Sequence, residues 1–127
     1  MLEGTILKAS MVIAGKDCDE QADTEEVAEA TLMCLRAAVP ASVPGIVFLS
    51  GGQSDEAATA HLNAMNQMGP HPWPLSFSYG RAMQTAALKL WAKDMQGNFA
   101  AAQKTVAQRA RENGLAALGK WSADAAG

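Results

Sequence analysis

Three segments of the sequence carry reactive or anion-binding residues directly after a short apolar run. In "EGTILKASM", Lys8 follows Ile6 and Leu7, although a hydrated ammonium is costly to remove from water. The run "GIVFLS" leads into "LSGG" at 49–52, and "LSFSY" leads into "SYGRA" at 78–82. A neutral lysine amine attacks carbonyl carbons. The three endings therefore predict a nucleophilic amine close to an anion site.

The second and third segments have the features of a phosphate site. Ser50 offers a hydroxyl, and Gly51 and Gly52 allow a ligand to approach the backbone N–H groups closely. Gly80 and Arg81 open an expected helix, whose free N–H groups favour an anion, and a guanidinium can hold a phosphate through two hydrogen bonds. Two neighbouring strand ends that converge on one phosphate are typical of the last strands of α/β barrels.

Each feature also has a plain structural interpretation. A lysine at a strand end is commonly a solvated charge, "SGG" is commonly a turn, and Gly80–Arg81 is commonly a helix cap with an exposed side chain. The predicted site is absent only if all three of these structural interpretations are correct at once. Glu3 is excluded as the acid partner of Lys8, because side chains alternate along a strand and the two positions have opposite parity.

Composition narrows the classes of protein. With 127 residues, 49% of them apolar and 18% charged, the chain predicts a single globular domain over residues 1–127. A net charge of −3 disfavours nucleic acid as a partner, since no basic surface is expected. No apolar run approaches the roughly eighteen residues of a membrane span. We therefore expect a cytoplasmic protein that binds neither nucleic acid nor membrane.

The cysteines and histidines indicate neither a disulfide framework nor a metal site. Cys18 and Cys34 form no C-x-x-C, and His61 and His71 have no partner at ligand spacing. We expect reduced, structural cysteines and surface histidines. We expect the tryptophans to serve in packing: Trp73, Trp91 and Trp121.

The hydrophobic pattern predicts three βα units and a further helix. Strands are expected at about 5–7, in "GIVFLS" and in "LSFSY". The first helix should begin at Asp23 with Glu26 completing a capping box. Its inner face is expected to hold five residues: Val27, Ala30, Cys34, Leu35 and Ala38. The second helix should begin near Ser54 and point Leu62 and Met65 inward.

A third helix is expected in "GRAMQTAALKLW", and a fourth from Asn98, as its cap, to Asn113, ended by Gly114. The tail "WSADAAG" at 121–127 is expected to fray. Consecutive apolar residues in "GIVFLS" favour a parallel strand covered on both faces. Three βα units form part of an α/β architecture but cannot close a barrel of eight. Because the first strand begins almost at Met1, we expect a fragment or a chain that needs a partner.

The same segments resemble a known family. "LEGTILKASM", "VPASVPGIVFLSGGQSDEAATAHLNAMN" and "PWPLSFSYGRAMQTAALKLW" are similar, in this order, to the last three βα units of class I, Schiff-base-forming fructose-bisphosphate aldolase, and the similarity continues through "RARENGLAALGKW". The resemblance implies a partial (β/α)8 TIM barrel, about the last three βα units plus a C-terminal helix. It implies that Lys8 forms the imine and that Ser50, Gly51, Gly80 and Arg81 bind a substrate phosphate, with Gly52 and Ser78 nearby.

The implied reaction is the reversible cleavage of fructose 1,6-bisphosphate to dihydroxyacetone phosphate and glyceraldehyde 3-phosphate in glycolysis and gluconeogenesis. Desolvation and nearby cations would have to lower the pKa of the Lys8 amine from about 10.4. The resemblance implies sugar phosphates as partners, a tetrameric parent enzyme, and no metal or cofactor. The family's aspartate, glutamate and further lysines come from earlier strands that this chain does not contain, so the chain alone is expected to be inactive.

Two other interpretations remain open. One is a different Schiff-base enzyme on the same barrel, such as a transaldolase or a deoxyribose-phosphate aldolase, although the paired "LSGGQS" and "SYGRA" argue against it. The other is a non-catalytic α/β fragment that binds phosphate or associates with other chains through an exposed sheet edge.

Overall fold

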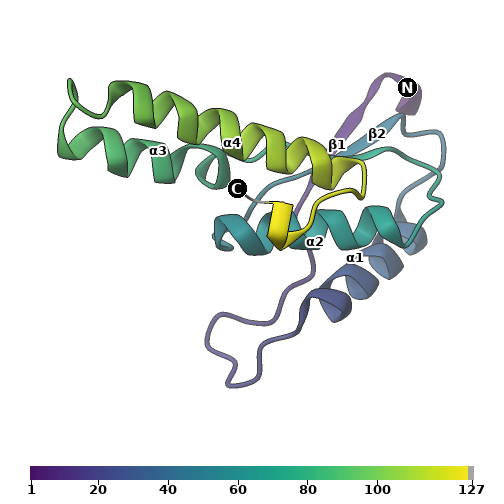
Figure 1. The fold of residues 1–127 in the computed structure, drawn as a ribbon. Helices are drawn as coiled ribbons and strands as arrows, with labels where there is room; N and C mark the ends of the chain where they lie inside the picture. The colour runs from purple at the N-terminus through teal and green to yellow at the C-terminus, as the bar shows by residue number, and fades with distance from the viewer. Residues whose placement is uncertain (126–127) are drawn as a thin grey trace.

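The computed structural model describes residues 1–125 and contains three consecutive βα units followed by a further helix (Figure 1). The elements are β1 (Ile6–Ala9), α1 (Thr24–Ala38), β2 (Gly45–Phe48), α2 (Asp55–Gln67), β3 (Leu75–Phe77), α3 (Arg81–Lys93) and α4 (Phe99–Ala117). Short 3-10 segments lie at Leu2–Gly4 and Ala123–Ala125. The predicted α/β order is confirmed.

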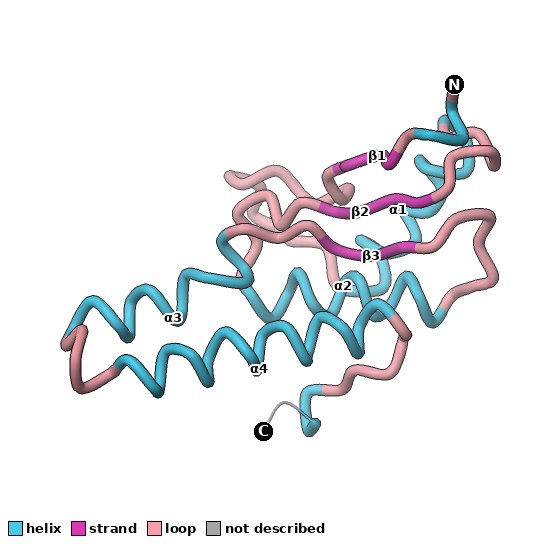
Figure 2. The backbone as a smooth tube through the Cα atoms, turned by 90° about the horizontal axis from the view of Figure 1, so that it is seen from above, coloured by secondary structure: helices cyan, strands magenta, loops and turns pink. Residues whose placement is uncertain are grey.

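The strands form one parallel sheet in the order β1-β2-β3, seen from above in Figure 2. Lys8 is paired with Val47, and Val47 with Ser76, so the carboxyl ends of the three strands lie at the same edge. This edge is where the "LSGG" and "SYGRA" segments leave the sheet.

Helices cover only one face of the sheet. Ile46, Phe48 and Leu75 on that face are buried in the same apolar core as Leu62 of α2 and Val27 of α1. On the opposite face Ile6 is 61% exposed, Lys8 is exposed, and Val47 and Ser76 are half-buried. The prediction that β2 is a parallel strand is confirmed, but its second face is only partly covered by the described residues, since Gly45 is buried and Val47 half-buried. A run of apolar residues looks the same whether its second face meets protein or solvent.

The start of α1 is as predicted. The Asp23 carboxylate accepts the Glu26 N–H at 2.9 Å, and the Glu26 carboxylate accepts the Asp23 N–H at 3.0 Å, which completes the capping box. The start of α2 is also confirmed, because the Ser54 hydroxyl accepts the Ala57 N–H. Leu62 and Met65 of α2 are fully buried, as expected.

The inner face of α1 is only partly as predicted. Val27 and Leu35 are buried and Ala30 is half-buried, but Cys34 and Ala38 are exposed. The buried face is rotated towards three other residues: Ala28, Thr31 and Leu32. Thr31 can be buried because its hydroxyl donates to the Val27 carbonyl and accepts the Val12 N–H.

Helix α4 differs from its prediction at both ends. Asn98 occupies the N-cap position, but its amide donates to the Leu90 carbonyl and makes no cap hydrogen bond. The helix continues through Gly114 to Ala117. Gly119, with φ +67°, is the glycine that adopts the left-handed conformation after the helix.

Cys18 and Cys34 are free and exposed, so neither side chain packs in the core. Trp73 is buried and its Nε1–H donates to the Pro40 carbonyl, whereas Trp91 is 38% exposed. Trp121 packs against the core, and its backbone N–H donates to the Asn63 side-chain oxygen at 2.9 Å. The start of the tail is thus anchored rather than frayed, and residues 126–127 lie outside the described part.

Helices α3 and α4 form an antiparallel hairpin that extends away from the sheet (Figures 1 and 2). A shallow apolar groove of about 270 Å³ runs between them, with Trp91, Phe99 and Val106 in its wall. In the described residues, no helix is long and apolar enough to cross a membrane.

Candidate functional site

Lys8 is the third residue of β1 and lies on the uncovered face of the sheet. Side chains alternate along the strand, so Leu7 and Ala9 turn towards the helices and Lys8 turns away from them. Lys8 is exposed. The expected desolvation of this amine is therefore absent from the described structure, because no described element covers that face.

The turn after β2 contains the residues predicted to approach an anion. Ser50 is buried, and its carbonyl accepts the Gln53 N–H at 3.1 Å. Gly51 and Gly52 both have positive φ, at 62° and 81°, which side chains with a Cβ rarely adopt. The glycines are thus required by the backbone of this turn, which leads directly into α2.

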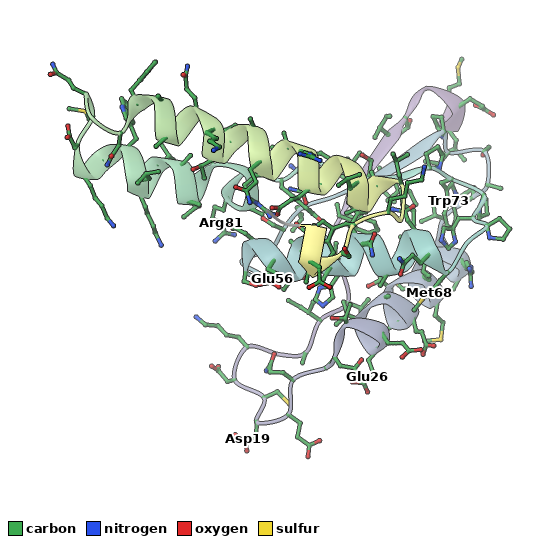
Figure 3. All side chains as sticks on the ribbon, viewed as in Figure 1. Asp19, Glu26, Glu56, Met68, Trp73 and Arg81 are labelled. Atoms are coloured by element: carbon green, nitrogen blue, oxygen red, sulfur yellow. The ribbon has the colours of Figure 1, made fainter. Side chains whose placement is uncertain are left out.

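The start of α3 supplies the second half of the predicted site. Gly80 is the N-cap residue and has no side chain to satisfy the first N–H groups of the helix, which Arg81 begins. Arg81 is exposed, and Figure 3 labels it where α3 begins. A Cβ added at Gly52 would lie 3.7 and 3.8 Å from the two terminal guanidinium nitrogens of Arg81.

The structure therefore brings Gly52 and Arg81 together, from turns that follow two adjacent strands. Ser78 is exposed where β3 ends, and its backbone N–H donates to the Phe48 carbonyl at 2.8 Å, which joins the end of β3 to β2.

Gly51, Gly52 and Arg81 all line one cleft of about 660 Å³. Ser50 and Gly80 adjoin these lining residues in sequence.

The side chains that line this cleft carry a net positive charge. It includes Lys16 and Arg81 and no carboxylate. It also includes His61, which we expected at the surface but which is only 8% exposed. Its Nδ1 lies 2.5 Å from the Gln53 side-chain oxygen, and burial lowers the pKa of the imidazole below 6.5. His61 is therefore neutral near pH 7 and contributes no fixed charge to the cleft.

The second histidine lies away from the cleft lining. His71 is half-buried, and its Nε2 donates to the Met65 carbonyl at 2.6 Å, so its predicted surface position is only partly correct. In the residues that the structure describes, no group of three or more histidine, cysteine or acidic side chains is arranged to hold a metal ion.

A buried polar cluster behind the cleft was not predicted from the sequence. It consists of Arg109, Glu112 and Asn113 of α4 and Thr59 of α2, all at most 8% exposed. Arg109 and Glu112 form an ion pair. In the sequence, the cluster is visible only as two charged residues and an amide on one face of an alanine-rich helix. Because an exposed helix face has the same pattern, the sequence does not indicate that these residues are buried.

Comparison with known proteins gives a consistent result. A family model described as "Glycolytic: Fructose-bisphosphate aldolase class-I" matches residues 1–127. A probable fructose-bisphosphate aldolase class 1 from Xanthomonas axonopodis pv. citri is 75% identical over 95% of this chain and 36% of the relative. Fructose-bisphosphate aldolase 1 from Toxoplasma gondii is 52% identical over the whole chain and 35% of the relative.

A solved structure gives the corresponding match in three dimensions. The ternary co-crystal structure of fructose-bisphosphate aldolase from Plasmodium falciparum with TRAP and a small molecule inhibitor superposes with a TM-score of 0.90 at 48% identity. The match covers 95% of this chain and 35% of that chain, so the chain spans about a third of the length of its relatives. Its three βα units and final helix form part of a TIM barrel. Sequence and fold together show that this chain belongs to the class-I fructose-bisphosphate aldolase family.

Proposed function

We propose that this chain is the carboxy-terminal part of a cytoplasmic class I fructose-bisphosphate aldolase and supplies its imine-forming lysine and one substrate-phosphate site. The parent enzyme would cleave fructose 1,6-bisphosphate reversibly in glycolysis and gluconeogenesis, as a homo-oligomer. The proposal depends mainly on one observation. A Cβ added at Gly52, in the glycine turn after β2, would lie 3.7 Å from the guanidinium of Arg81 at the start of α3. Both turns leave the sheet edge at which the Lys8 strand also ends.

The phosphate would be held between the two turns. Gly51 and Gly52 expose backbone N–H groups without a Cβ in the way, and Ser50 offers its hydroxyl. Gly80 leaves the first turn of α3 open, so its free N–H groups and the Arg81 guanidinium can face the same anion. A phosphate held there would fix the substrate so that its carbonyl carbon reaches the Lys8 amine, which turns remote binding energy into orientation.

Lys8 would carry the covalent step. Its neutral amine attacks the C2 carbonyl carbon, and loss of water from the resulting carbinolamine gives a protonated imine. The electron pair of the C3–C4 bond moves into this imine as the aldehyde product leaves, and an enamine remains. Protonation of the enamine and addition of water then release dihydroxyacetone phosphate and the free amine.

The proton transfers need groups that the resemblance assigns to earlier strands of the barrel. The exposure of Lys8 points the same way, since desolvation of the amine needs protein on the face of β1 that is uncovered here. We therefore propose that the reaction requires the preceding strands in addition to this chain.

Borohydride trapping tests the role of Lys8. The chain is incubated with dihydroxyacetone phosphate and sodium borohydride, alone or with the preceding part of the Xanthomonas relative, and the modified lysine is located by mass spectrometry. We expect a stable secondary amine at Lys8 only in the mixture. Lys8→Arg should abolish it, and Lys89→Arg, which changes an exposed lysine of α3, should not.

The other outcomes are equally informative. Modification of Lys8 in the chain alone would support the imine role and refute the need for covering strands. If Lys8 stays unmodified in both samples while the added part and the chain associate, the enzymatic proposal is wrong.

The exposure of Lys8 and the uncovered sheet face also favour a second candidate function, a non-catalytic fragment that binds phosphate or associates with other chains. Ile6 on that face is 61% exposed, which suits a surface that another chain covers. Binding of inorganic phosphate at Arg81 without any imine trapping in the mixture would favour this candidate.

A further inference from the structure

Arg109 of α4 joins the starts of α2 and α3. Its Nε–H donates to the Ala82 carbonyl at 2.9 Å, and its Nη2 donates to the Asp55 carbonyl at 2.9 Å and to the Thr59 hydroxyl at 2.6 Å. Its Nη1 donates to the Glu112 carboxylate at 2.5 Å. Arg109 is only 8% exposed, so one buried guanidinium contacts three helices.

The charge of Arg109 is balanced inside the protein. Glu112, 6% exposed, pairs with it and also accepts a hydrogen bond from Gln108. The Thr59 hydroxyl, which accepts from Arg109, lies 2.7 Å from the Asn113 side-chain oxygen. A buried ion pair is tolerated when its remaining hydrogen-bonding groups are satisfied, and such a pair is rigid.

The two carbonyls that Arg109 contacts lie next to the two halves of the proposed phosphate site. Asp55 begins α2 directly after the turn that contains Gly52. Ala82 follows Arg81 in the first turn of α3. Each carbonyl oxygen has two lone pairs, so it can accept from Arg109 as well as from its own helix.

A second contact holds the other side of Gly80–Arg81. The buried Tyr79 hydroxyl donates to the Ala58 carbonyl of α2 at 2.8 Å. Desolvation raises the pKa of Tyr79 well above its usual value, and the positive charge of Arg109 offsets part of this rise. The residues on both sides of Gly80–Arg81 are therefore connected to α2. Tyr79 is bonded to α2 directly, and Ala82 is connected to it through Arg109.

We propose that Arg109 is a positioning residue that fixes the distance between the Gly51–Gly52 turn and Arg81. The inference rests on the proposed phosphate site and adds to it a residue that does not touch the ligand. A guanidinium is planar and its donors point in fixed directions, so two carbonyls bonded to it keep a set separation. An anion site loses affinity when its two halves move apart, because hydrogen bonds to one phosphate need alignment within about 0.5 Å.

Phosphate titration of the chain, followed by NMR of assigned backbone amides, tests this proposal. In the wild-type chain, inorganic phosphate should shift the Gly51, Gly52 and Arg81 amides with one common Kd. Arg109→Met should raise that Kd by about tenfold or more, the equivalent of one charged hydrogen bond. Arg111→Met, two positions further along α4 and exposed, should leave Kd within about twofold.

Two further variants separate positioning from general destabilisation. Leu35→Ala removes a buried side chain of α1 far along the chain from the cluster, so it should lower stability and leave the Kd unchanged. Arg109→Lys keeps the charge but lacks the planar guanidinium, whose donors point in fixed directions, so it should also weaken phosphate binding. This variant replaces Arg109→Met if the latter does not fold.

The failures can be told apart. If wild-type amides do not respond to phosphate, the proposed phosphate site is wrong and the proposal for Arg109 is wrong with it. If the wild type responds and a folded Arg109 variant binds within twofold of it, only the positioning role is refuted. An equal loss of affinity in Leu35→Ala would also refute that role, because stability alone would then explain the effect.

Discussion

Alanine at Gly51 should destabilise the chain, whereas alanine at Gly80 should not. Gly51 has φ +62°, where an alanine costs about 1–2 kcal/mol. Its Cβ would also lie 3.2 Å from a methyl group of Leu49, which must shift by a few tenths of an ångström. We expect Gly51→Ala to lower the free energy of unfolding by about 1–2 kcal/mol.

Gly80→Ala is the matched control, because the same methyl group is added to the other half of the site. Gly80 has φ −92°, and nothing lies within 4 Å of an added Cβ. The lower entropy of the unfolded alanine chain gains about 0.4–1 kcal/mol, and the poorer N-cap offsets a similar amount. We expect the free energy of unfolding to stay within about 0.5 kcal/mol of the wild type.

Urea unfolding followed by circular dichroism measures both variants. With an m-value of about 2 kcal/mol/M, the midpoint of Gly51→Ala should fall by roughly 0.5–1 M relative to Gly80→Ala. Equal midpoints would refute the reasoning, because they would mean that the turn after β2 relaxes to a conformation in which a Cβ is unstrained. A larger loss at Gly80 would likewise contradict it.

Three further predictions concern the fold around the site. Because burial lowers the pKa of His61, the unfolded chain binds more protons than the folded chain below pH 6.5. The free energy of unfolding should therefore fall as the pH drops below 6.5, and His61→Gln should reduce this slope in urea titrations at each pH. Leu62→Ala should cost about 2–5 kcal/mol in the same assay, against under about 1 kcal/mol for the exposed Leu88→Ala. Asp23→Ala should cost about 1 kcal/mol by removing the α1 cap, and an unchanged midpoint would contradict the capping box.

Local chemistry made part of the fold predictable. Asp23 and Ser54 cap their helices through side chains within three residues, so the sequence alone specifies both starts. Gly51 and Gly52 were expected to let a ligand approach the backbone, and their positive φ values, which glycine tolerates best, were not predicted. Gly114 was misleading because an isolated glycine costs a helix only about 1 kcal/mol, and packing of α4 overcomes this.

Properties that depend on tertiary placement could not be predicted. Whether Lys8 is desolvated depends on what covers its face of the sheet, and Cys34 is exposed because the packing of α1 sets the rotation of its face. His61 is buried, and its ring nitrogen is paired with the side chain of Gln53 from the turn before α2. The two carbonyls that Arg109 contacts lie 27 and 54 positions away along the chain, a separation at which local periodicity gives no information.

The shape of the α3–α4 hairpin sets a gradient of local stability along these two helices. Arg109, Glu112, Asn113 and Ala116 are buried near the sheet, whereas residues 93–97 at the far end are all exposed. Amide protons at that tip can exchange with solvent through local opening that leaves the rest of the molecule intact. Protection against deuterium should therefore rise from the tip towards the hydrogen-bonded amides of α4 around Arg109.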